Sequence, residues 1–341
     1  METIIFNHPD GEAIAYAACV IRSGGLVAFP TETVYGLGAT ALDASAAAKI
    51  FAAKGRPSDN PLIIHLAASE DAVKYAYVSS AYDKLAQFMP GPITVILPKR
   101  NCIPDSVTGG LQTVAVRVPC HPIARALIQA AGVPIAAPSA NLSGKPSCTK
   151  AAHVKNDMFG RVEVILDGGD SDYGLESTIV MPIGDNEIKL LRPGAVTVEM
   201  LTKAGFSVSL DKAVTEKLAE DEIPLAPGMK YRHYAPDARV ILLDGEKDKI
   251  DVFIREHSGD PHTAFIVYEE DAALVDGCIF VVISKRHDTA TYAHNLFSAL
   301  RDLDAMTSID TIYAPLPESD HIGLALYNRL MKAAGYSVLK I

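Results

Sequence analysis

The chain has 341 residues, which is too long for one ordinary core and predicts two domains of about 100 to 200 residues each. Apolar residues make up 49% of the sequence and charged residues 21%, a balance that excludes disordered and fibrous proteins. The formal net charge of −10 disfavours tight non-specific binding to nucleic acid, because such binding depends on cations that neutralise phosphates.

The sequence offers no sign of a membrane or of export. Its longest apolar stretches, such as residues 61–68, are far shorter than the roughly 20 residues of a membrane-spanning helix. Residues 1–9 predict a short strand and lack the basic start and apolar stretch of an export signal, so we expect a cytoplasmic protein. The five cysteines are scattered without a C-x-x-C pair, which favours reduced structural thiols.

The first part of the chain alternates strand and helix signals. Apolar residues at helical spacing predict a helix over 11–22, and a short buried strand over 26–29 follows it. A turn-rich segment at 30–38 then leads into an Ala-rich helix over 44–54. Further strands are predicted at 62–66, 93–97, 113–118, 135–137, 162–166, 177–181 and 187–191, with helices between several of them. The pattern is typical of a mixed α/β domain, to which we assign residues 1–206.

Residues 207–237 predict a linker, because three prolines and a glycine interrupt regular structure there. The linker is unusual in that aromatic and basic side chains crowd its end, at 229–236. Beyond it, strands are predicted at 240–243, 264–268, 279–283 and 311–314, and helices at 248–256, 289–305 and 322–334. This alternation predicts a small doubly wound, Rossmann-like α/β domain at residues 238–341.

Several common catalytic signatures are absent from the sequence. It has no G-x-x-x-x-G-K-[ST] loop and no G-x-G-x-x-G between a strand and a helix, which disfavours a P-loop NTPase and a conventional dinucleotide enzyme. It also lacks G-x-S-x-G and H-E-x-x-H, so simple hydrolases lose support.

Polar residues follow the predicted strand at 26–29. Thr31, Glu32, Thr33 and Tyr35 place hydroxyls, a carboxylate and a phenol at one strand end. The crevice outside strand ends is where open α/β sheets bind ligands. A capped loop without a ligand explains these residues equally well.

Two cations follow the predicted helix at 44–54. Lys54 ends the helix, and Gly55 and Pro57 fix a turn that holds Arg56 beside it. A planar guanidinium and a point charge on one turn suit a polyphosphate. Solvated cations that compensate the helix dipole are an equally good explanation.

A third polar segment follows the predicted strand at 135–137. It presents Ser139 and Asn141 two residues apart. Short hydroxyl and amide side chains can hydrogen-bond a phosphate, a ribose or a base. Asx or Ser turns are the structural alternative.

Together these segments carry a resemblance to a known family. P-T-E-T-V-Y-G-L at 30–37, K-G-R at 54–56 and S-A-N-L-S-G at 139–144 closely resemble the threonylcarbamoyl-AMP synthases, as do the blocks at 113–119, 174–180 and 191–194. The likeness is to the longer form of the family, in which a YrdC-like catalytic domain with a twisted mixed sheet precedes an added C-terminal domain. Residues 231–236 look like the linker signature of that form, and the resemblance spans nearly the whole chain.

The resemblance implies a nucleotidyltransferase. Such enzymes join L-threonine, bicarbonate or CO2 and ATP into threonylcarbamoyl-AMP and release pyrophosphate; a separate complex then transfers the group to tRNA, giving N6-threonylcarbamoyladenosine beside the anticodon. By similarity, the catalytic signature is Lys54, Arg56, Ser139 and Asn141. The residues implied to bind ATP, besides Lys54, are Arg56, Asn60, Thr113, Ser139, Asn141, Ser147, Arg192 and Tyr231. Those implied to surround threonine are Thr31, Thr33, Tyr35, His65, Arg117 and Ser177.

The implied chemistry agrees with the missing catalytic motifs. Carboxylation of the threonine amine gives a carbamate, an anion whose attack on the α-phosphate needs no strong general base. Catalysis then consists of positioning and charge neutralisation, by Lys54, Arg56, Arg192 and a divalent metal. Because we find no carboxylate cage, we expect Mg²⁺ to be carried with ATP and no residue to be a metal ligand.

Two residues in apolar strands leave alternatives open. Arg117 needs a partner, because an unpaired buried cation is unfavourable, and that partner is either the threonine carboxylate or a buried Asp or Glu. His65 is by default a satisfied core histidine, and only the family resemblance favours a role in threonine binding.

The linker is expected to act as a lid, because carbamates lose CO2 and mixed anhydrides hydrolyse. Tyr231, Arg232 and Tyr234 would contact the nucleotide while Pro227 and Gly228 set the bend. The alternative is that these aromatic side chains join the two domains.

Two rival functions share features with this sequence. A carbamoyltransferase maturation enzyme shares the YrdC-like fold, but it carries zinc-binding cysteine pairs and an acylphosphatase-like domain for which this chain has neither the cysteines nor the length. An RNA-binding module without catalysis is disfavoured by the net charge of −10. The sequence leaves open whether RNA contacts this chain, and any such binding is expected to be weak.

Overall fold

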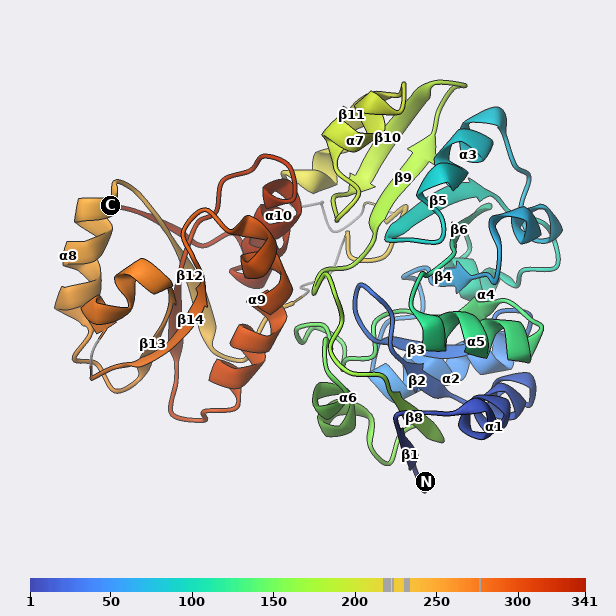
Figure 1. Ribbon diagram of the computed structural model, residues 1–341, viewed down its shortest axis with the longest axis horizontal. Coiled ribbons are helices and arrows are strands. Elements are labelled where there is room, and N and C mark those ends of the chain that lie inside the picture. Colours follow the sequence, from blue (N-terminus) through green and yellow to red (C-terminus); the bar gives the residue numbers. More distant parts are fainter. Residues whose placement is uncertain (217–221, 223, 230–233, 276) are drawn as a thin grey trace. The chain divides into compact units, whose positions relative to one another are not determined.

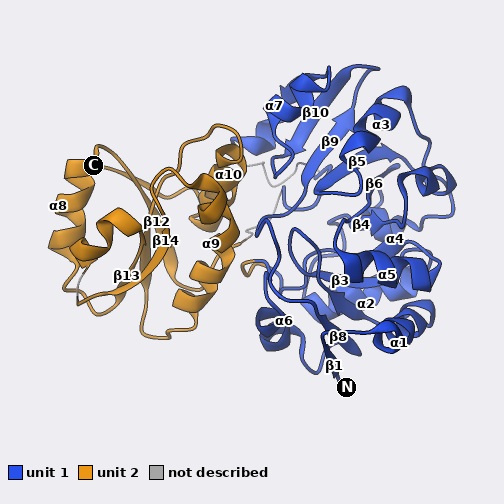
Figure 2. Cartoon of the chain, viewed as in Figure 1, with its two compact units in different colours: residues 1–143, 147–230 blue, residues 144–146, 231–341 orange. Residues whose placement is uncertain are grey.

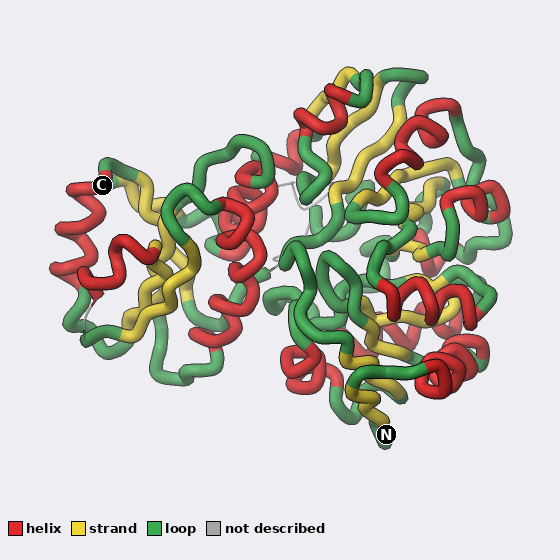
Figure 3. Tube along the Cα trace, viewed as in Figure 1, coloured by secondary structure: helices red, strands yellow, loops and turns green. Residues whose placement is uncertain are grey.

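The computed structural model describes residues 1–216, 222, 224–229, 234–275 and 277–341. The chain divides into two compact units (Figure 1, Figure 2). Unit 1 comprises residues 1–143 and 147–230, and unit 2 comprises residues 144–146 and 231–341. Helices and strands alternate along both units (Figure 3). None of the helices in the described ranges is long and apolar enough to cross a membrane.

Unit 1 is built on a mixed sheet of 11 strands in the order β1-β8-β2-β3-β7-β4-β6-β5-β9-β10-β11. The strands are β1 (Ile4–Asn7), β2 (Val27–Phe29), β3 (Gly36–Thr40), β4 (Ile63–His65), β5 (Ile93–Pro98), β6 (Thr113–Arg117), β7 (Ile135–Ala136), β8 (Val164–Asp167), β9 (Thr178–Pro182), β10 (Glu187–Arg192) and β11 (Ser207–Leu210). The helices are α1 (Gly11–Arg22), α2 (Ala44–Lys54), α3 (Ser80–Leu85), α4 (Asp105–Thr108), α5 (Pro122–Ala131), α6 (Ala151–Met158) and α7 (Val198–Lys203), with 3-10 turns η1 (Ser69–Lys74), η2 (Ala86–Phe88) and η3 (Lys212–Val214). The predicted mixed α/β architecture is confirmed.

The helices that lead to the site begin and end as their sequences require. Asp10 caps α1 by accepting hydrogen bonds from the amides of Glu12 and Ala13. Gly55 ends α2 in the left-handed conformation, with φ of 61°. This C-cap turns the chain sharply after Lys54 and sends the next residues toward β4.

Three strands lie where the sequence predicted none: β3, β11 and β16 (Val338–Lys340). β3 occupies part of the turn-rich segment at 30–38. The sequence did not predict it, because Gly36 and Gly38 lack the branched side chains that indicate a strand. A Cβ on Gly38 would lie 2.7 Å from atoms of both Phe29 and Ile135, so only glycine allows this close packing. β11 pairs with β10 in parallel and continues regular structure past the predicted boundary at 206.

One face of the unit 1 sheet carries two apolar clusters. The first joins α1 and α5 to strands β2, β7 and β8, and includes Phe29 and Ile135. The second includes Ile63 of β4, Ile179 of β9 and, from the linker, Ala226 and Met229. Polar residues of the candidate site lie on the same strands as these clusters.

Unit 2 contains a five-stranded parallel sheet in the order β14-β13-β15-β12-β16. Its strands are β12 (Arg239–Asp244), β13 (Thr263–Tyr268), β14 (Ile279–Ser284), β15 (Thr311–Pro315) and β16 (Val338–Lys340). Its helices are α8 (Lys247–His257), α9 (Thr289–Asp304) and α10 (Gly323–Ala333), with the 3-10 segment η4 (Glu269–Val275). Figure 1 shows α8 on one face of this sheet and α9 and α10 on the other. The predicted doubly wound domain is confirmed.

Candidate active site

Three loops of unit 1 that are distant in sequence are joined by backbone hydrogen bonds. The amide of Tyr35 donates to the carbonyl of Cys148 at 2.8 Å, and the amide of Ala140 donates to the carbonyl of Tyr35 at 2.8 Å. The amide of Ser143 donates to the carbonyl of Lys54 at 2.9 Å. The structure therefore brings together the three segments that the sequence analysis singled out.

Lys54 connects two of these loops through its side chain. The residue is 2% exposed, and its ammonium donates to the backbone carbonyls of Ser139 and Asn141. The Ser139 hydroxyl in turn donates to Oδ1 of Asn141, whose amide nitrogen donates to the carbonyl of Leu142. The cation thus fixes the backbone that presents the serine and the asparagine.

Three further residues implied to bind ATP lie close to Lys54 in the chain or on β6. Arg56 is half-buried and donates to the carbonyl of Pro61 at 3.2 Å, which closes the turn after α2. Asn60 is 1% exposed, and its Oδ1 has no hydrogen-bond partner among the residues that the structure describes. A buried amide oxygen in this condition is unfavourable unless a ligand or an ordered water donates to it. Thr113 is half-buried at the start of β6.

A row of polar side chains crosses the sheet beside these loops. His65 on β4 pairs in register with Arg117 on β6, which pairs with Thr94 on β5. Residues paired in register point to the same face of a sheet, so these three side chains are neighbours. All three are at least nine-tenths buried. Such a row is unusual in a sheet interior and marks the face for a polar ligand.

Arg117 has a carboxylate partner, which is the structural alternative left open by the sequence. Its NH2 group donates to Oε1 of Glu32 at 2.6 Å, and Glu32 is fully buried. The guanidinium Nε has no partner among the described residues, so Glu32 uses only part of the fork. Burial alone would raise the pKa of Glu32, but Arg117 and the amide of Cys120 lower it below the ordinary value. The pair is therefore ionised at neutral pH.

His65 is a neutral core histidine in this structure. It is 3% exposed, its Nδ1 lies 3.3 Å from the carbonyl of Ile135, and its ring meets that of Phe29 edge to face. Burial, and then the charge of Arg117, lower the pKa of His65 to about 3. Because a carbonyl only accepts, Nδ1 carries the proton and Nε2 is left as an acceptor.

Replacing His65 should reduce the loss of unfolding free energy that the protein shows as the pH falls. A buried neutral histidine stabilises the fold above its unfolded pKa of 6.5, and this contribution is lost as the pH falls toward the folded value of about 3. We expect the free energy of unfolding of His65→Gln to fall less than that of the wild type between about pH 7 and about pH 5. Urea unfolding at both pH values measures this, and the exposed His287→Gln is the control. Equal slopes for all three proteins would contradict the interpretation.

The 31–35 loop is ordered by its own hydroxyls. Thr31 donates to the carbonyl of Val34 at 2.6 Å and lies 2.9 Å from the hydroxyl of Thr33. Since Thr31 has used its proton, the Thr33 hydroxyl is the donor in that contact. Tyr35 donates to the carbonyl of Gly169 at 2.7 Å and accepts from the amide of Gly168 at 3.2 Å. Its hydroxyl therefore fixes the 168–169 loop.

Ser177 and Arg192 extend the polar row toward β10. The Ser177 hydroxyl lies 2.7 Å from that of Thr94, and Arg192 donates to both the hydroxyl and the carbonyl of Ser177. Arg192 also donates to the carbonyl of Pro227 at 3.3 Å. The linker backbone is thus bound to a residue implied to contact ATP.

Ser147 has a buried acidic partner that the sequence analysis did not assign to the site. Its hydroxyl lies 2.5 Å from Oε1 of Glu176, and the two residues are 1% and 6% exposed. Glu176 and Thr94 are polar residues of the site that the sequence analysis did not name, and Glu32 is one that it named without assigning it a partner or a ligand. Glu32 and Glu176 stand within the recognised sequence blocks, so their position beside apolar strands was the available signal. Thr94 resembles any β-branched strand residue and gave none.

The linker contributes to unit 1 through residues 224–229. Ala226 and Met229 are buried in the second apolar cluster, beside Ile63 and Ile179. Tyr231 and Arg232, which were predicted to contact the nucleotide, lie outside the described residues. Tyr234 belongs to unit 2, where its ring stacks on Phe297 with centroids 5.2 Å apart.

Within the described ranges, no three histidine, cysteine, aspartate or glutamate side chains gather in a way that could hold a metal ion. The acidic residues of the site instead bind Arg117 and Ser147.

Comparisons with known proteins agree with this architecture. A family model described as "Telomere recombination", named for Sua5, YciO and YrdC, matches residues 19–194, and a model described as "Threonylcarbamoyl-AMP synthase, C-terminal domain" matches residues 196–335. A YrdC-like domain followed by this second domain defines the longer form of the fold. The chain belongs to the threonylcarbamoyl-AMP synthase family, which confirms the resemblance found in the sequence.

Individual relatives match over almost their full lengths. The threonylcarbamoyl-AMP synthase of Pyrococcus abyssi is 45% identical over 339 residues, covering 96% of each chain. That of Bacillus subtilis is 44% identical and covers 96% of this chain and 94% of its own. The crystal structure of P. abyssi Sua5 complexed with L-threonine superposes with a TM-score of 0.90 at 44% identity, covering 99% of this chain and all of that one.

Proposed function

We propose that this chain forms threonylcarbamoyl-AMP from L-threonine, bicarbonate or CO2 and ATP, with release of pyrophosphate. The observation that supports this best is the contact of Lys54 with the carbonyls of Ser139 and Asn141, because it joins the signature residues in one site. Membership of the family indicates the reaction. The row of polar side chains beside the loops, His65, Arg117 and Thr94, can contact the charged groups of the substrates. The activity would make the protein a nucleotidyltransferase that feeds a separate transfer complex acting on tRNA.

The division of the site follows from its geometry. The loops around Lys54, Arg56 and Asn141 would hold the nucleotide, since they offer cations and short polar groups. The row from His65 through Arg117 would receive threonine, with the remaining guanidinium donor of Arg117 directed to its carboxylate. Mg²⁺ would arrive bound to the ATP phosphates, where it would neutralise charge on pyrophosphate.

The threonine pocket is expected to discriminate weakly against serine. The two amino acids differ by one methyl group, which a pocket distinguishes by about 1 to 3 kcal/mol. We expect kcat/KM for serine to lie roughly 10- to 200-fold below that for threonine, measured as ATP-dependent pyrophosphate release. A preference above roughly 1,000-fold would exceed what methyl burial provides and would contradict this assignment of the pocket.

The linker would close the site against water after loading. Its described part is bound at two places, through Met229 in the apolar cluster and through the carbonyl of Pro227 on Arg192. Deleting residues 229–236 is expected to shorten the lifetime of the enzyme-bound adenylate, because hydrolysis competes once water enters. Product lifetime is measured by mass spectrometry after quenching at intervals, and an unchanged lifetime would reject the lid.

The function itself is tested by incubating the full chain with ATP, Mg²⁺, bicarbonate and L-threonine and detecting the adenylate by mass. We expect a product that disappears when any one of ATP, bicarbonate and threonine is omitted. Pyrophosphate release without a threonine-dependent adenylate would overturn the proposal. Tight RNA binding without ATP turnover would support the rival RNA-binding module instead.

A further inference from the structure

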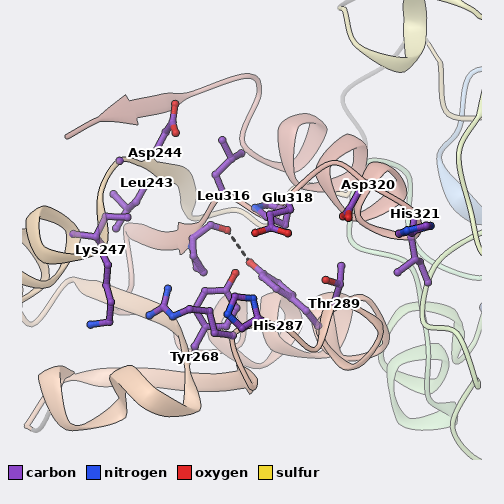
Figure 4. Close-up of a pocket in the computed structure, with 17 residues that line it drawn as sticks. Leu243, Asp244, Lys247, Tyr268, His287, Thr289, Leu316, Glu318, Asp320 and His321 are labelled. Carbon is purple, nitrogen blue, oxygen red and sulfur yellow. Dashed lines mark hydrogen bonds between the residues drawn. The ribbon is translucent and has the colours of Figure 1, made fainter.

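Unit 2 encloses a cavity of about 390 Å³ at the carboxyl edge of its sheet (Figure 4). The ends of β12, β13 and β15 and the segment after β14 form its walls. The polar and charged side chains among the lining residues are Asp244, Lys247, Tyr268, Arg286, His287, Thr289, Tyr292, Glu318, Asp320 and His321. A cavity of this size accommodates a small metabolite, since ligand pockets begin at about 300 Å³.

The cavity lies where the sheet changes its winding direction. The chain leaves β12 through α8 toward β13 on one side, whereas it leaves the neighbouring β15 through α10 toward β16 on the other. Parallel crossovers in opposite directions place α8 and α10 on opposite faces, as Figure 1 shows. In open α/β sheets the crevice outside such a switch point is the usual ligand site.

Two helices begin beside the cavity without a side-chain cap, although the first amide of α10, that of Gly323, donates to the carbonyl of Asp320 at 2.7 Å. Lys247 is the first residue of α8, and Ile322 immediately precedes α10; neither helix has a side-chain hydrogen bond at its cap. By contrast, α9 is capped by Asp288, which accepts from the amide of Thr291 at 3.0 Å. Free amides and the positive end of the helix dipole attract an anion, and they do so most where no side chain already occupies them.

Tyr268 offers the cavity a hydrogen-bond donor that the fold does not use. The residue is 7% exposed and lines the cavity, yet its hydroxyl makes no hydrogen bond to any residue that the structure describes. Arg286 packs over its ring at 4.8 Å, which holds the ring in place without using the hydroxyl. Burial raises the pKa of Tyr268 to about 12, so the hydroxyl keeps its proton at neutral pH and is available as a donor.

The charged side chains are spread unevenly along the cavity. Lys247 and Asp244 lie toward one end in Figure 4, and Asp320 and His321 lie at the other, with Tyr268, His287 and Glu318 between them. Arg286 and Lys247 both pair with the buried Asp271, and Lys247 also pairs with Asp251 at 2.5 Å, so these carboxylates hold the two cations in place. The carboxylates of Glu318 and Asp320 can only accept hydrogen bonds when ionised. A ligand that contacts these groups would present an anionic group to Lys247 and Arg286 and hydroxyl groups to the carboxylates.

We propose that this cavity binds a nucleoside monophosphate, with the phosphate on the α8 N-terminus, Lys247, Arg286 and the Tyr268 hydroxyl, and with ribose hydroxyls donating to Glu318 and Asp320. A free amino acid carries opposite charges as well, but it would leave most of the volume empty. The site lies wholly within unit 2 and does not depend on the reaction proposed for unit 1.

The proposal is tested by titrating the full-length protein with AMP and following backbone amide resonances. We expect saturable shifts at Gly245, Lys247 and Thr289, residues of unit 2 that report on this cavity separately from any AMP bound in unit 1. Tyr268→Phe removes only a hydroxyl that the fold does not use, so it should weaken AMP at these resonances about fivefold or more without altering the unfolding midpoint. Tyr313→Phe, on the neighbouring β15 and outside the cavity lining, is the matched control and should bind like the wild type.

Glu318→Gln distinguishes binding of the ribose hydroxyl groups from binding of the phosphate. It should weaken AMP about fivefold and leave the binding of inorganic phosphate at the same resonances unchanged, because phosphate has no hydroxyl group for this carboxylate to bind. Absence of shifts at Gly245 and Thr289, equal AMP affinity in Tyr268→Phe and Tyr313→Phe, or inorganic phosphate binding as tightly as AMP would each overturn the proposal.

Discussion

Replacing Lys54 by methionine is expected to reduce adenylate formation about 100-fold or more. The methionine side chain fills similar space but cannot donate to the carbonyls of Ser139 and Asn141, so the loop that presents these residues loses its anchor. Each buried carbonyl left without a donor also destabilises the fold by about 1 to 3 kcal/mol. Turnover is measured at saturating ATP and threonine, and urea unfolding establishes that the assayed protein is folded.

Lys49→Met is the matched control, because Lys49 lies on the same helix and also donates to a backbone carbonyl, that of Gly24 at 2.6 Å. Its contact is with the turn after α1 rather than with the site, so the variant should keep nearly full turnover. If both lysine variants lose activity equally, the effect is on α2 as a whole. If Lys54→Met keeps more than a tenth of the activity, the anchor does not limit catalysis.

The role of Lys54 also shows how far the sequence predicts this site. Its position at the end of a helix, beside a glycine, identified it as a candidate cation for phosphate. In the structure the same ammonium bonds to two carbonyls more than 80 positions away in the chain. Local spacing cannot reveal such a contact, because it depends on which strand lies next to which in the sheet. The residue was predictable, and its partners were not.

The fold, like the site, could be predicted from the sequence only in part. Strands with branched apolar residues, such as β5 and β12, were predicted within about two residues of their observed ends. β3 was missed because its glycines serve the packing of Phe29 rather than any local strand preference. The partner of Arg117 was predicted only as a type, since the cost of a buried cation requires a carboxylate but does not say which one. Proximity in the folded sheet selects Glu32.

Replacing Arg117 by methionine is expected to destabilise the protein by about 3 to 5 kcal/mol, because Glu32 would remain buried and charged without its partner. The double variant Glu32→Gln with Arg117→Met should recover most of this loss, since it removes the uncompensated charge. Urea unfolding measures both effects. The exposed pair Lys74–Asp71 has the same distance of 2.6 Å, and Lys74→Met should leave the free energy of unfolding unchanged, because solvent screens a surface pair.

The pKa of Glu32 determines how the stability difference between the wild type and Arg117→Met changes with pH. In the wild type the pKa of Glu32 is lowered, so the pair stabilises the fold fully above the ordinary glutamate value of 4.5 and loses this contribution as the pH falls through the lower folded value. In Arg117→Met the Cys120 amide still donates to Glu32, but the guanidinium no longer opposes the effect of burial, so the pKa of Glu32 rises above its wild-type value and the variant regains stability as the carboxyl takes up a proton. The difference between the two proteins should therefore shrink from neutral pH toward pH 4.5. A constant difference would show that Arg117 stabilises the fold through packing.

Threonine turnover in the double variant decides whether Arg117 also binds the substrate. A restored fold with a strongly raised KM for threonine would mean that it does, and restored turnover would mean that it does not.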